Sequence, residues 1–307
     1  MTPSTPPTPA PDASSAARTP PIVWSIAGTD PTAGAGIQAD LKTFHGLQVY
    51  GCTVITAVIA QNTQGVQRIA MADAKTVEAQ LDALASDLPP RAIKIGMLGN
   101  ADIVTVVARA LSRLDAYVVC DPVFGSSSGT NLLDPNAIEP FLSRLLPGVD
   151  VLTPNIPEAE RLCGHAIQSP AQVEQAAATL YTLGAGSVLI KGGHAPGPFV
   201  QDYWTNGTDG LWLTAARIDT RHSRGTGCAL SSAIAAARAH GLTELDALVL
   251  GRMYVNQGLR LAPGLGKGNG PIYHGTWPVH AEDRPWLTAT ADAGWTTDGL
   301  GDASTPL

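Results

Sequence analysis

A glycine loop from Ser223 to Cys228 carries the clearest chemical potential, because it runs directly into an alanine-rich stretch that is expected to be a helix. Glycine lets the backbone approach a ligand closely. The first N–H groups of a helix lack internal partners and lie at the positive end of its dipole. Gly225, Thr226, Gly227 and Cys228 are therefore predicted to cradle an anion such as a phosphate. The alternative is an ordinary glycine-containing loop before a buried helix.

Cys228 adds a reactive group to this loop. A thiol at a helix start is expected to have a lowered pKa, which makes Cys228 a candidate base or nucleophile; otherwise it is a small buried residue. A cradle with a base suits phosphoryl transfer to a hydroxyl, whereas a cradle with a nucleophile suits acyl transfer. Acyl transfer needs a histidine base nearby, and the local candidates His222 and His240 have no recognisable spacing.

Further candidate residues recur at the ends of buried strands. They are Gln61, Met97, Asp121, Asn155 and Lys191. Open α/β sheets bind ligands beyond the carboxyl ends of their strands, so this recurrence predicts one shared cleft. Asp121 is either a metal- or phosphate-site acid or a turn residue, and Lys191 either reaches a phosphate or is an exposed turn lysine. Glu158 either meets Asn155 at a helix start or is a simple capping acid.

Strands and helices alternate along the chain to position these residues. Apolar runs predict strands over 22–27, 52–60, 92–97, 117–120, 151–153 and 187–190. Helical spacing of apolar residues predicts helices over 37–47, 76–88, 101–114, 172–183 and 245–261. One late hairpin, 201–204 with 210–214, is expected around Asn206-Gly207. The pattern predicts a doubly wound α/β domain with a mostly parallel sheet.

Composition limits the classes of function. The 307 residues carry a formal net charge of −7 and no long basic run, which argues against a nucleic-acid partner. Four widely spaced cysteines argue against a zinc site or a disulfide scaffold and favour the cytoplasm. The sequence contains no run of about 18 apolar residues, so no membrane-spanning helix is predicted. Gly34 to Ala39 matches the dinucleotide fingerprint formally but lacks its strand and acid context, so a nicotinamide site is disfavoured.

The domain is expected to span residues 22–274. Residues 1–21 are rich in Pro, Ser, Thr and Ala and are expected to be disordered. Residues 275–307 are polar with little pattern and are expected to form a flexible tail.

Eight sequence blocks in order carry a family resemblance. They are 27–31, 35–44, 54–57 with 61–66, 94–98, 121–123, 152–160, 191–194 and 225–228. Over about residues 22 to 274 the chain resembles the hydroxymethylpyrimidine/phosphomethylpyrimidine kinases of thiamine synthesis. The resemblance implies a ribokinase-like fold, a homodimer, and ATP-dependent phosphorylation of a pyrimidine hydroxymethyl group and then of the monophosphate.

The resemblance also implies roles for residues. Gln61 would read the aminopyrimidine edge, and the pocket would be completed by Asp40, Gly28, Ala35, Met97 and Val123. Cys228 would be the base within the loop of Gly225, Thr226 and Gly227. The ATP-binding residues would be Lys191, Asn155 and Thr226, and Asp121 with Glu158 would organise Mg²⁺.

Three positions depart from the family pattern. Ser127 stands where a lysine is frequent, Ser223-Arg224 replaces Thr-His, and Asn269 replaces a histidine. Arg224 is the candidate to supply the missing positive charge at the phosphates. Three alternatives stay open: a pyridoxal-type kinase on the same fold, a cysteine-nucleophile acyl transferase, and a non-catalytic vitamin-binding module.

Overall fold

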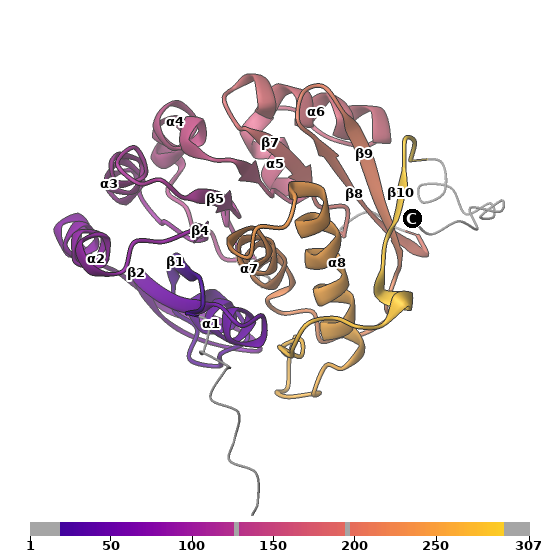
Figure 1. The fold of residues 1–307 in the computed structure, drawn as a ribbon, viewed down its shortest axis with the longest axis horizontal. Coiled ribbons are helices and arrows are strands. Elements are labelled where there is room, and N and C mark those ends of the chain that lie inside the picture. The colour runs from indigo at the N-terminus through magenta and orange to yellow at the C-terminus, as the bar shows by residue number, and fades with distance from the viewer. Residues whose placement is uncertain (1–18, 126–128, 194–196, 292–307) are drawn as a thin grey trace, which may run out of the picture.

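The computed structural model describes residues 19–125, 129–193 and 197–291 (Figure 1). Ser127, residues 1–18 of the predicted N-terminal tail and residues 292–307 of the predicted C-terminal tail lie outside the described residues. Among the described helices, none has the length and apolar character that crossing a membrane requires.

The described strands form one sheet, in the order β10-β9-β8-β7-β6-β5-β4-β1-β2-β3. Its parallel centre consists of β1 (Ile22–Gly28), β2 (Tyr50–Asn62), β4 (Ala92–Ile95), β5 (Tyr117–Cys120), β6 (Val151–Leu152) and β7 (Ser187–Ile190). Apart from β2, which has 13 residues, these strands have seven residues or fewer and are mainly apolar and buried, because helices cover both faces of a parallel sheet. The predicted doubly wound, mostly parallel α/β sheet is confirmed.

Antiparallel strands flank this centre on both sides. At one edge, β8 (Phe199–Thr205) and β9 (Gly210–Ala216) form the late hairpin that the Asn-Gly turn predicted. At the other edge, β2 runs past its predicted end and returns as β3 (Gly65–Met71). The prediction of a single hairpin is therefore wrong. The polar cluster 61–65 comprises the end of β2, the turn and the first residue of β3.

Helices cover the two faces of the sheet (Figure 1). One face packs against α1 (Gly36–Gly46), α7 (Thr226–Ala239) and α8 (Glu244–Arg260). The other face packs against α2 (Ala74–Asp87), α3 (Ala101–Leu111), α5 (Ile156–Cys163), α6 (Pro170–Thr182) and an irregular helical segment, 135–148, that contains α4 (Ile138–Pro140). Each layer therefore buries its own apolar cluster against the strands.

The alanine-rich helix α7 has a structural reason for its composition. Ser231, Ser232 and the run from Ala233 to Ala237 are fully buried. Gly251 of α8 makes room for the larger side chains of α7, since a Cβ there would lie 2.9 Å from Ile234 Cγ1 and 3.1 Å from Leu230 Cδ1. The same close packing fixes the position of the amino end of α7, where the glycine loop lies.

The tail predicted from residue 275 is not flexible over its described part. Residues 286–288 form β10 (Trp286–Thr288), which pairs antiparallel with β9. Arg260 of α8 pairs with Glu282 and Asp283, and Asn256 Nδ2 donates to the carbonyl of Asp283 at 2.9 Å. A strand of three residues is too short to show alternation in the sequence, so the prediction failed there.

Candidate active site

A cavity of about 650 Å³ lies at the carboxyl edge of the parallel strands. Residues at or just beyond six strand ends line it, namely Gly28, Gln61, Met97, Asp121, Asn155 and Lys191. The cavity wall also includes Ala35, Val123, Glu158, Gly225, Thr226, Gly227 and Cys228. The shared cleft predicted from strand ends is confirmed, and it contains every predicted site residue except Asp40.

Asp40 lies beneath the cavity, so the prediction that it lines the substrate pocket is wrong. Its side chain is fully buried and accepts hydrogen bonds from Ser25 Oγ at 2.6 Å and Ser232 Oγ at 2.8 Å. Lys94 Nζ approaches the two carboxylate oxygens at 3.0 and 2.8 Å. Burial disfavours the ammonium, but Asp40 raises the pKa of Lys94 above its ordinary value. Lys94 is the member of this pair that reaches the cavity wall.

The backbone of the glycine loop lies very close to Gly34, Asp121 and Lys191. Gly225 caps α7 with φ of +83°, a left-handed conformation that favours glycine. A Cβ there would lie 1.9 Å from the carbonyl oxygen of Gly34. A Cβ at Gly227 would lie 3.1 Å from Asp121 Oδ2 and 3.2 Å from Lys191 Nζ. The Thr226 N–H already donates to the carbonyl of Ser223 at 3.4 Å. The backbone at Gly227, in the first turn of α7, lies beside the Lys191 ammonium, and a helix start next to a cation suits a phosphate.

Lys191 lies between two buried carboxylates. Its Nζ is 2.5 Å from Asp121 Oδ1 and 4.0 Å from Glu158 Oε2. Burial opposes the ammonium, yet Asp121 and Glu158 raise the pKa of Lys191 above its ordinary value. Burial raises the pKa of Glu158 to about 7, with Lys191 opposing and Asp121 adding to the shift. The lysine is thus a buried cation of the site rather than an exposed turn residue.

Glu158 also has the capping role that the sequence left open. Its Oε2 accepts from the backbone N–H of Asn155 at 2.8 Å, and Asn155 Oδ1 accepts from the N–H of Glu158 at 2.9 Å. This reciprocal capping box starts α5. It holds the Glu158 carboxylate at the cavity wall, so the structural and the site reading of this residue are compatible.

The two carboxylates fit a Mg²⁺ ion that arrives with phosphates. Asp121 and Glu158 are both buried and share the Lys191 ammonium, so an additional cation would offset their remaining negative charge. No group of three or more His, Cys, Asp or Glu side chains that could hold a metal occurs in the part of the chain that the structure describes. Mg²⁺ typically needs only one or two carboxylates when substrate phosphates and water complete its shell.

Cys228 does not have the lowered pKa that its place at a helix start predicted. Burial raises the pKa of its thiol to about 11. Lys94 and a hydrogen bond from the backbone of Gly36 favour the thiolate, but Asp40 and Asp121 add to the effect of burial. The thiol is therefore protonated at neutral pH in the ligand-free protein. Burial outweighs the helix dipole, whose contribution is typically 0.3–1 kcal/mol.

Arg224 extends toward Asp30 and Gln61 in this ligand-free structure, and its predicted role as a substitute phosphate contact stays a prediction. Its guanidinium is buried and donates from Nε to Asp30 Oδ2 at 3.1 Å and from Nη2 to Gln61 Oε1 at 2.6 Å. Gln61 Nε2 in turn donates to the carbonyl of Thr29 at 3.0 Å. The positive charge of Arg224 therefore belongs to the half of the cavity that contains the predicted pyrimidine reader.

Lys94, Thr29 and Arg252 were missed as parts of the site, although all three line the cavity. Lys94 had a visible signal, since a lone charge inside the apolar strand β4 must find a buried partner. Arg252 pairs with buried Asp202, which also accepts from the N–H of Gly192 at 2.9 Å. Arg252 lies within the otherwise ordinary helical pattern of α8, so nothing in the sequence distinguished it as a site residue.

Sequence relatives identify the family. The family model described as phosphomethylpyrimidine kinase matches residues 30–273. The chain belongs to this family. It is 43% identical to the hydroxymethylpyrimidine/phosphomethylpyrimidine kinase of Rhizobium meliloti (strain 1021), over 82% of this chain and 96% of that protein. It is 44% identical to the protein of the same name from Escherichia coli (strain K12), over 81% and 96%. The chain is therefore a phosphotransferase.

Solved structures confirm the ribokinase-like fold. The pyridoxal kinase from Staphylococcus aureus in complex with pyridoxal has a TM-score of 0.80 and 30% identity, covering 88% of this chain and 98% of that chain. The phosphomethylpyrimidine kinase from Clostridium difficile 630 has a TM-score of 0.68 and 37% identity, covering 76% and 97%. Sequence thus favours the pyrimidine kinases, whereas the superposition is somewhat better on a pyridoxal kinase.

Replacing Gly225 by alanine is expected to disable the phosphotransferase through geometry. Alanine at a left-handed position costs about 1–2 kcal/mol, and its Cβ, 1.9 Å from the oxygen of Gly34, forces the loop to move. Gly241→Ala is a matched control, since Gly241 has φ of +89° but no atom within 4 Å of the added Cβ. Urea unfolding should show a loss of stability in both variants, and steady-state assays a loss of kcat in Gly225→Ala alone. Equal activity in the two variants would show that the cradle does not depend on this contact.

Proposed function

We propose that this enzyme uses ATP to phosphorylate the hydroxymethyl group of 4-amino-5-hydroxymethyl-2-methylpyrimidine, and then the resulting monophosphate to the diphosphate. The proposal rests mainly on one observation. The same cavity joins a pocket with a polar amide, formed by Gln61, Met97 and Val123, to an anion cradle beside Lys191. The names of the sequence relatives support the same substrate class.

The pocket half of the cavity suits a small aromatic ring with a polar edge. Met97 is 5% exposed and Val123 is partly exposed, and both belong to the apolar cluster beside β2. A thioether and a branched side chain pack favourably on a ring. Gln61 supplies an amide with both donor and acceptor capacity, which matches the adjacent amino group and ring nitrogen of an aminopyrimidine.

The cradle half suits the phosphates of ATP. The backbone N–H groups from Gly225 to Cys228 would hold the transferring phosphoryl, and Lys191 would neutralise charge that develops on it. Asn155 and Thr226 also line the cavity. Asp121 and Glu158 would hold Mg²⁺, which supplies further charge neutralisation between the phosphates when it is bound. A related pyridoxal kinase from Staphylococcus aureus was solved with the ATP analogue AMP-PCP, which supports ATP as the donor.

Cys228 is the group proposed to accept the proton of the attacking hydroxyl. It lies in the first turn of α7 and lines the cavity that would hold the substrate hydroxyl. Phosphoryl transfer needs little covalent help, so positioning by the loop contributes most of the rate and the base adds to it. The nearby Lys94 ammonium favours the thiolate of Cys228 and would stabilise it when the thiol loses its proton.

The acyl-transfer alternative lacks its base in the described part of the cavity. No described histidine is among the residues that line it. His240 follows the last residue of α7, about 18 Å along the helix from Cys228, and bonds the carbonyl of Leu47 at 2.8 Å. A non-catalytic vitamin-binding module would not need the anion cradle or the carboxylates of Asp121 and Glu158.

The proposed substrate is tested by ADP formation. The enzyme is incubated with ATP and Mg²⁺ and either the hydroxymethylpyrimidine or pyridoxal, and kcat/KM is measured for each alcohol. We expect a higher kcat/KM for the pyrimidine. The better superposition on a pyridoxal kinase makes pyridoxal the second candidate, and a higher kcat/KM for pyridoxal would replace the proposed substrate.

Gln61→Ala is expected to raise the KM for the pyrimidine and to leave the KM for ATP nearly unchanged. Losing the partner of a buried polar group costs roughly 1–3 kcal/mol, equivalent to about a 5- to 150-fold weaker interaction. Steady-state kinetics with each substrate varied in turn measure the two constants. Gln67→Ala is the control, because Gln67 is an exposed glutamine of β3 in the same hairpin. An unchanged KM for the pyrimidine in Gln61→Ala would rule out the reading role.

The homodimer and the cytoplasmic location that the resemblance and composition suggested stay predictions.

A further inference from the structure

Arg224 connects the two functional halves of the cavity. Its backbone is fixed by a bond from its N–H to the carbonyl of Gly270 at 3.1 Å and by one from the N–H of Ile272 to its own carbonyl at 3.3 Å. The next residue, Gly225, caps α7 and begins the anion cradle. The side chain of Arg224 extends to Asp30 and Gln61 on the pocket side, and Arg224 is only 4% exposed. An arginine so placed acts on the pocket while it is covalently joined to the cradle.

We propose that Arg224 is a positioning residue that sets substrate specificity: its guanidinium holds the Gln61 amide in one orientation and so favours an aminopyrimidine over a pyridoxal. This inference rests on the proposed pyrimidine kinase activity and deepens it.

The orientation of the Gln61 amide follows from its two partners. The carbonyl of Thr29 only accepts, so the amide NH₂ must face it at 3.0 Å. The guanidinium of Arg224 only donates, so the amide oxygen must face it at 2.6 Å. A flipped amide would place two donors together at Arg224 and two acceptors together at Thr29. The two partners therefore leave one orientation, with one N–H and one oxygen lone pair free for a ligand.

The charge of Arg224 also changes the strength of that free edge. A hydrogen bond from a guanidinium to a neutral oxygen is charge-assisted. It polarises the amide, because bonds in a chain strengthen one another, and the free N–H becomes a better donor. Such an edge favours a ligand with an acceptor ring nitrogen next to an amino group. An aminopyrimidine has this pair, whereas pyridoxal has a hydroxyl and no amino group on its ring.

Asp30 extends the effect of Arg224 to the pocket loop. Its carboxylate is fully buried and accepts from the N–H groups of Thr32 at 3.0 Å and Ala35 at 2.9 Å, as well as from Arg224. Ala35 lies on the cavity wall. The guanidinium thus reaches two separate partners through two different nitrogens, a task that a single lysine ammonium does not reproduce.

Arg224→Lys is the first test. We expect the KM for the pyrimidine to rise about 10- to 100-fold, the loss typical of a charge-assisted hydrogen bond, with a smaller change in the KM for ATP. The ratio of kcat/KM for pyrimidine over pyridoxal should fall by a similar factor. Calorimetry with the pyrimidine in the absence of ATP should show the same weakening, which separates recognition from chemistry.

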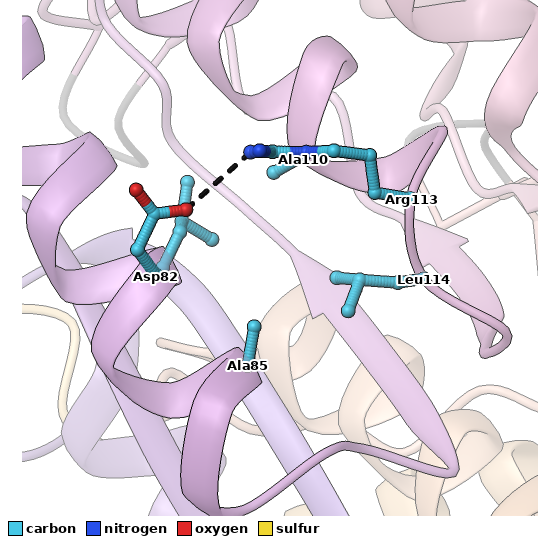
Figure 2. A pocket seen from close by; sticks show the side chains of 6 residues that line it. Asp82, Ala85, Ala110, Arg113 and Leu114 are labelled. Atoms are coloured by element: carbon cyan, nitrogen blue, oxygen red, sulfur yellow. Dashed lines mark hydrogen bonds and ion pairs between the residues drawn. The ribbon is translucent and has the colours of Figure 1, made fainter.

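A second variant guards against a folding defect. Arg224→Met alone would leave the buried Asp30 carboxylate without this cation, so Arg224→Met is combined with Asp30→Asn. Arg113→Met is the control arginine. Figure 2 shows Arg113 beside a small pocket between α2 and α3, where its Nη2 lies 3.4 Å from Asp82 Oδ1. These helices cover the opposite face of the sheet from α7. This control should keep both the KM values and the substrate preference.

The outcomes separate specificity from mere support of the fold. A lower pyrimidine affinity and a reduced preference in Arg224→Lys and in the double variant support the proposal. Unchanged KM and preference in both would overturn it. So would a uniform fall in kcat for both alcohols with an unchanged ratio, the sign of a purely structural role. Failure of the proposed function appears instead in the parent enzyme, as no pyrimidine turnover or a preference for pyridoxal, and it would remove this inference as well.

Discussion

Cys228→Ser is expected to lower kcat about 10²- to 10⁴-fold while the KM for ATP changes little, since general-base help is worth that much and the loop that holds the phosphoryl is kept. A serine hydroxyl gives up its proton far less readily than a thiol. Steady-state assays at saturating pyrimidine measure the loss. Cys163→Ser is the control, because Cys163 is a half-buried cysteine of α5 outside the cavity and should leave kcat unchanged.

Cys228→Asp and the pH profile of the parent complete this prediction. With a thiol pKa of about 11, the fraction of thiolate rises with pH, so kcat/KM of the parent should increase between about pH 7 and 9, by about tenfold per unit at most. A carboxylate is already ionised there, so Cys228→Asp should retain activity with a flatter profile. A covalent adduct on Cys228 during turnover, together with an inactive Cys228→Asp, would contradict the base role.

Asp121→Asn is expected to raise the Mg²⁺ concentration needed for half-maximal rate by about 10- to 100-fold, the range seen even for partners outside the metal's own shell. The substitution removes a buried negative charge 2.5 Å from Lys191, so Glu158 and the ammonium would be left to balance the phosphates. Mg²⁺ titrations of the rate at fixed ATP measure the shift.

Asp102→Asn is the matched control for this titration, because Asp102 is an exposed aspartate in the first turn of α3. Its Mg²⁺ titration should coincide with that of the parent. If Asp121→Asn also titrates like the parent, the carboxylate is structural and its bond to Lys191 is its main role.

Much of the fold follows from patterns that are local in sequence. Apolar runs such as Val118 to Cys120 predict buried strands, and alternation with helices predicts the parallel centre of the sheet. The cleft was predictable for the same reason, since parallel strands deliver Asp121 and Lys191 to one edge. β3 was missed because most of its side chains are partly or fully exposed, which leaves little hydrophobic pattern. The three residues of β10 gave no periodic signal at all.

The errors within the site come from interactions between distant segments. Lys94 and Asp40 are 54 positions apart, and Arg224 and Asp30 are 194 apart, so neither pair is visible in a local pattern. In the first pair, Lys94 binds Asp40 beneath the pocket. In the second, Asp30 holds the Arg224 guanidinium, which also donates to Gln61. The pKa of Cys228 was misjudged because the helix start was visible in sequence and the burial around the thiol was not.

Successive phosphorylation of the pyrimidine alcohol in this cavity is tested most directly by following the products with ³¹P NMR. The enzyme is incubated with the hydroxymethylpyrimidine, Mg²⁺ and excess ATP. We expect a phosphomonoester signal coupled to the methylene protons, followed by the signals of a diphosphate as the monoester is consumed, with ADP formed at the same rate. ATP that stays intact, or that is consumed without a phosphorus–methylene coupling, would contradict it.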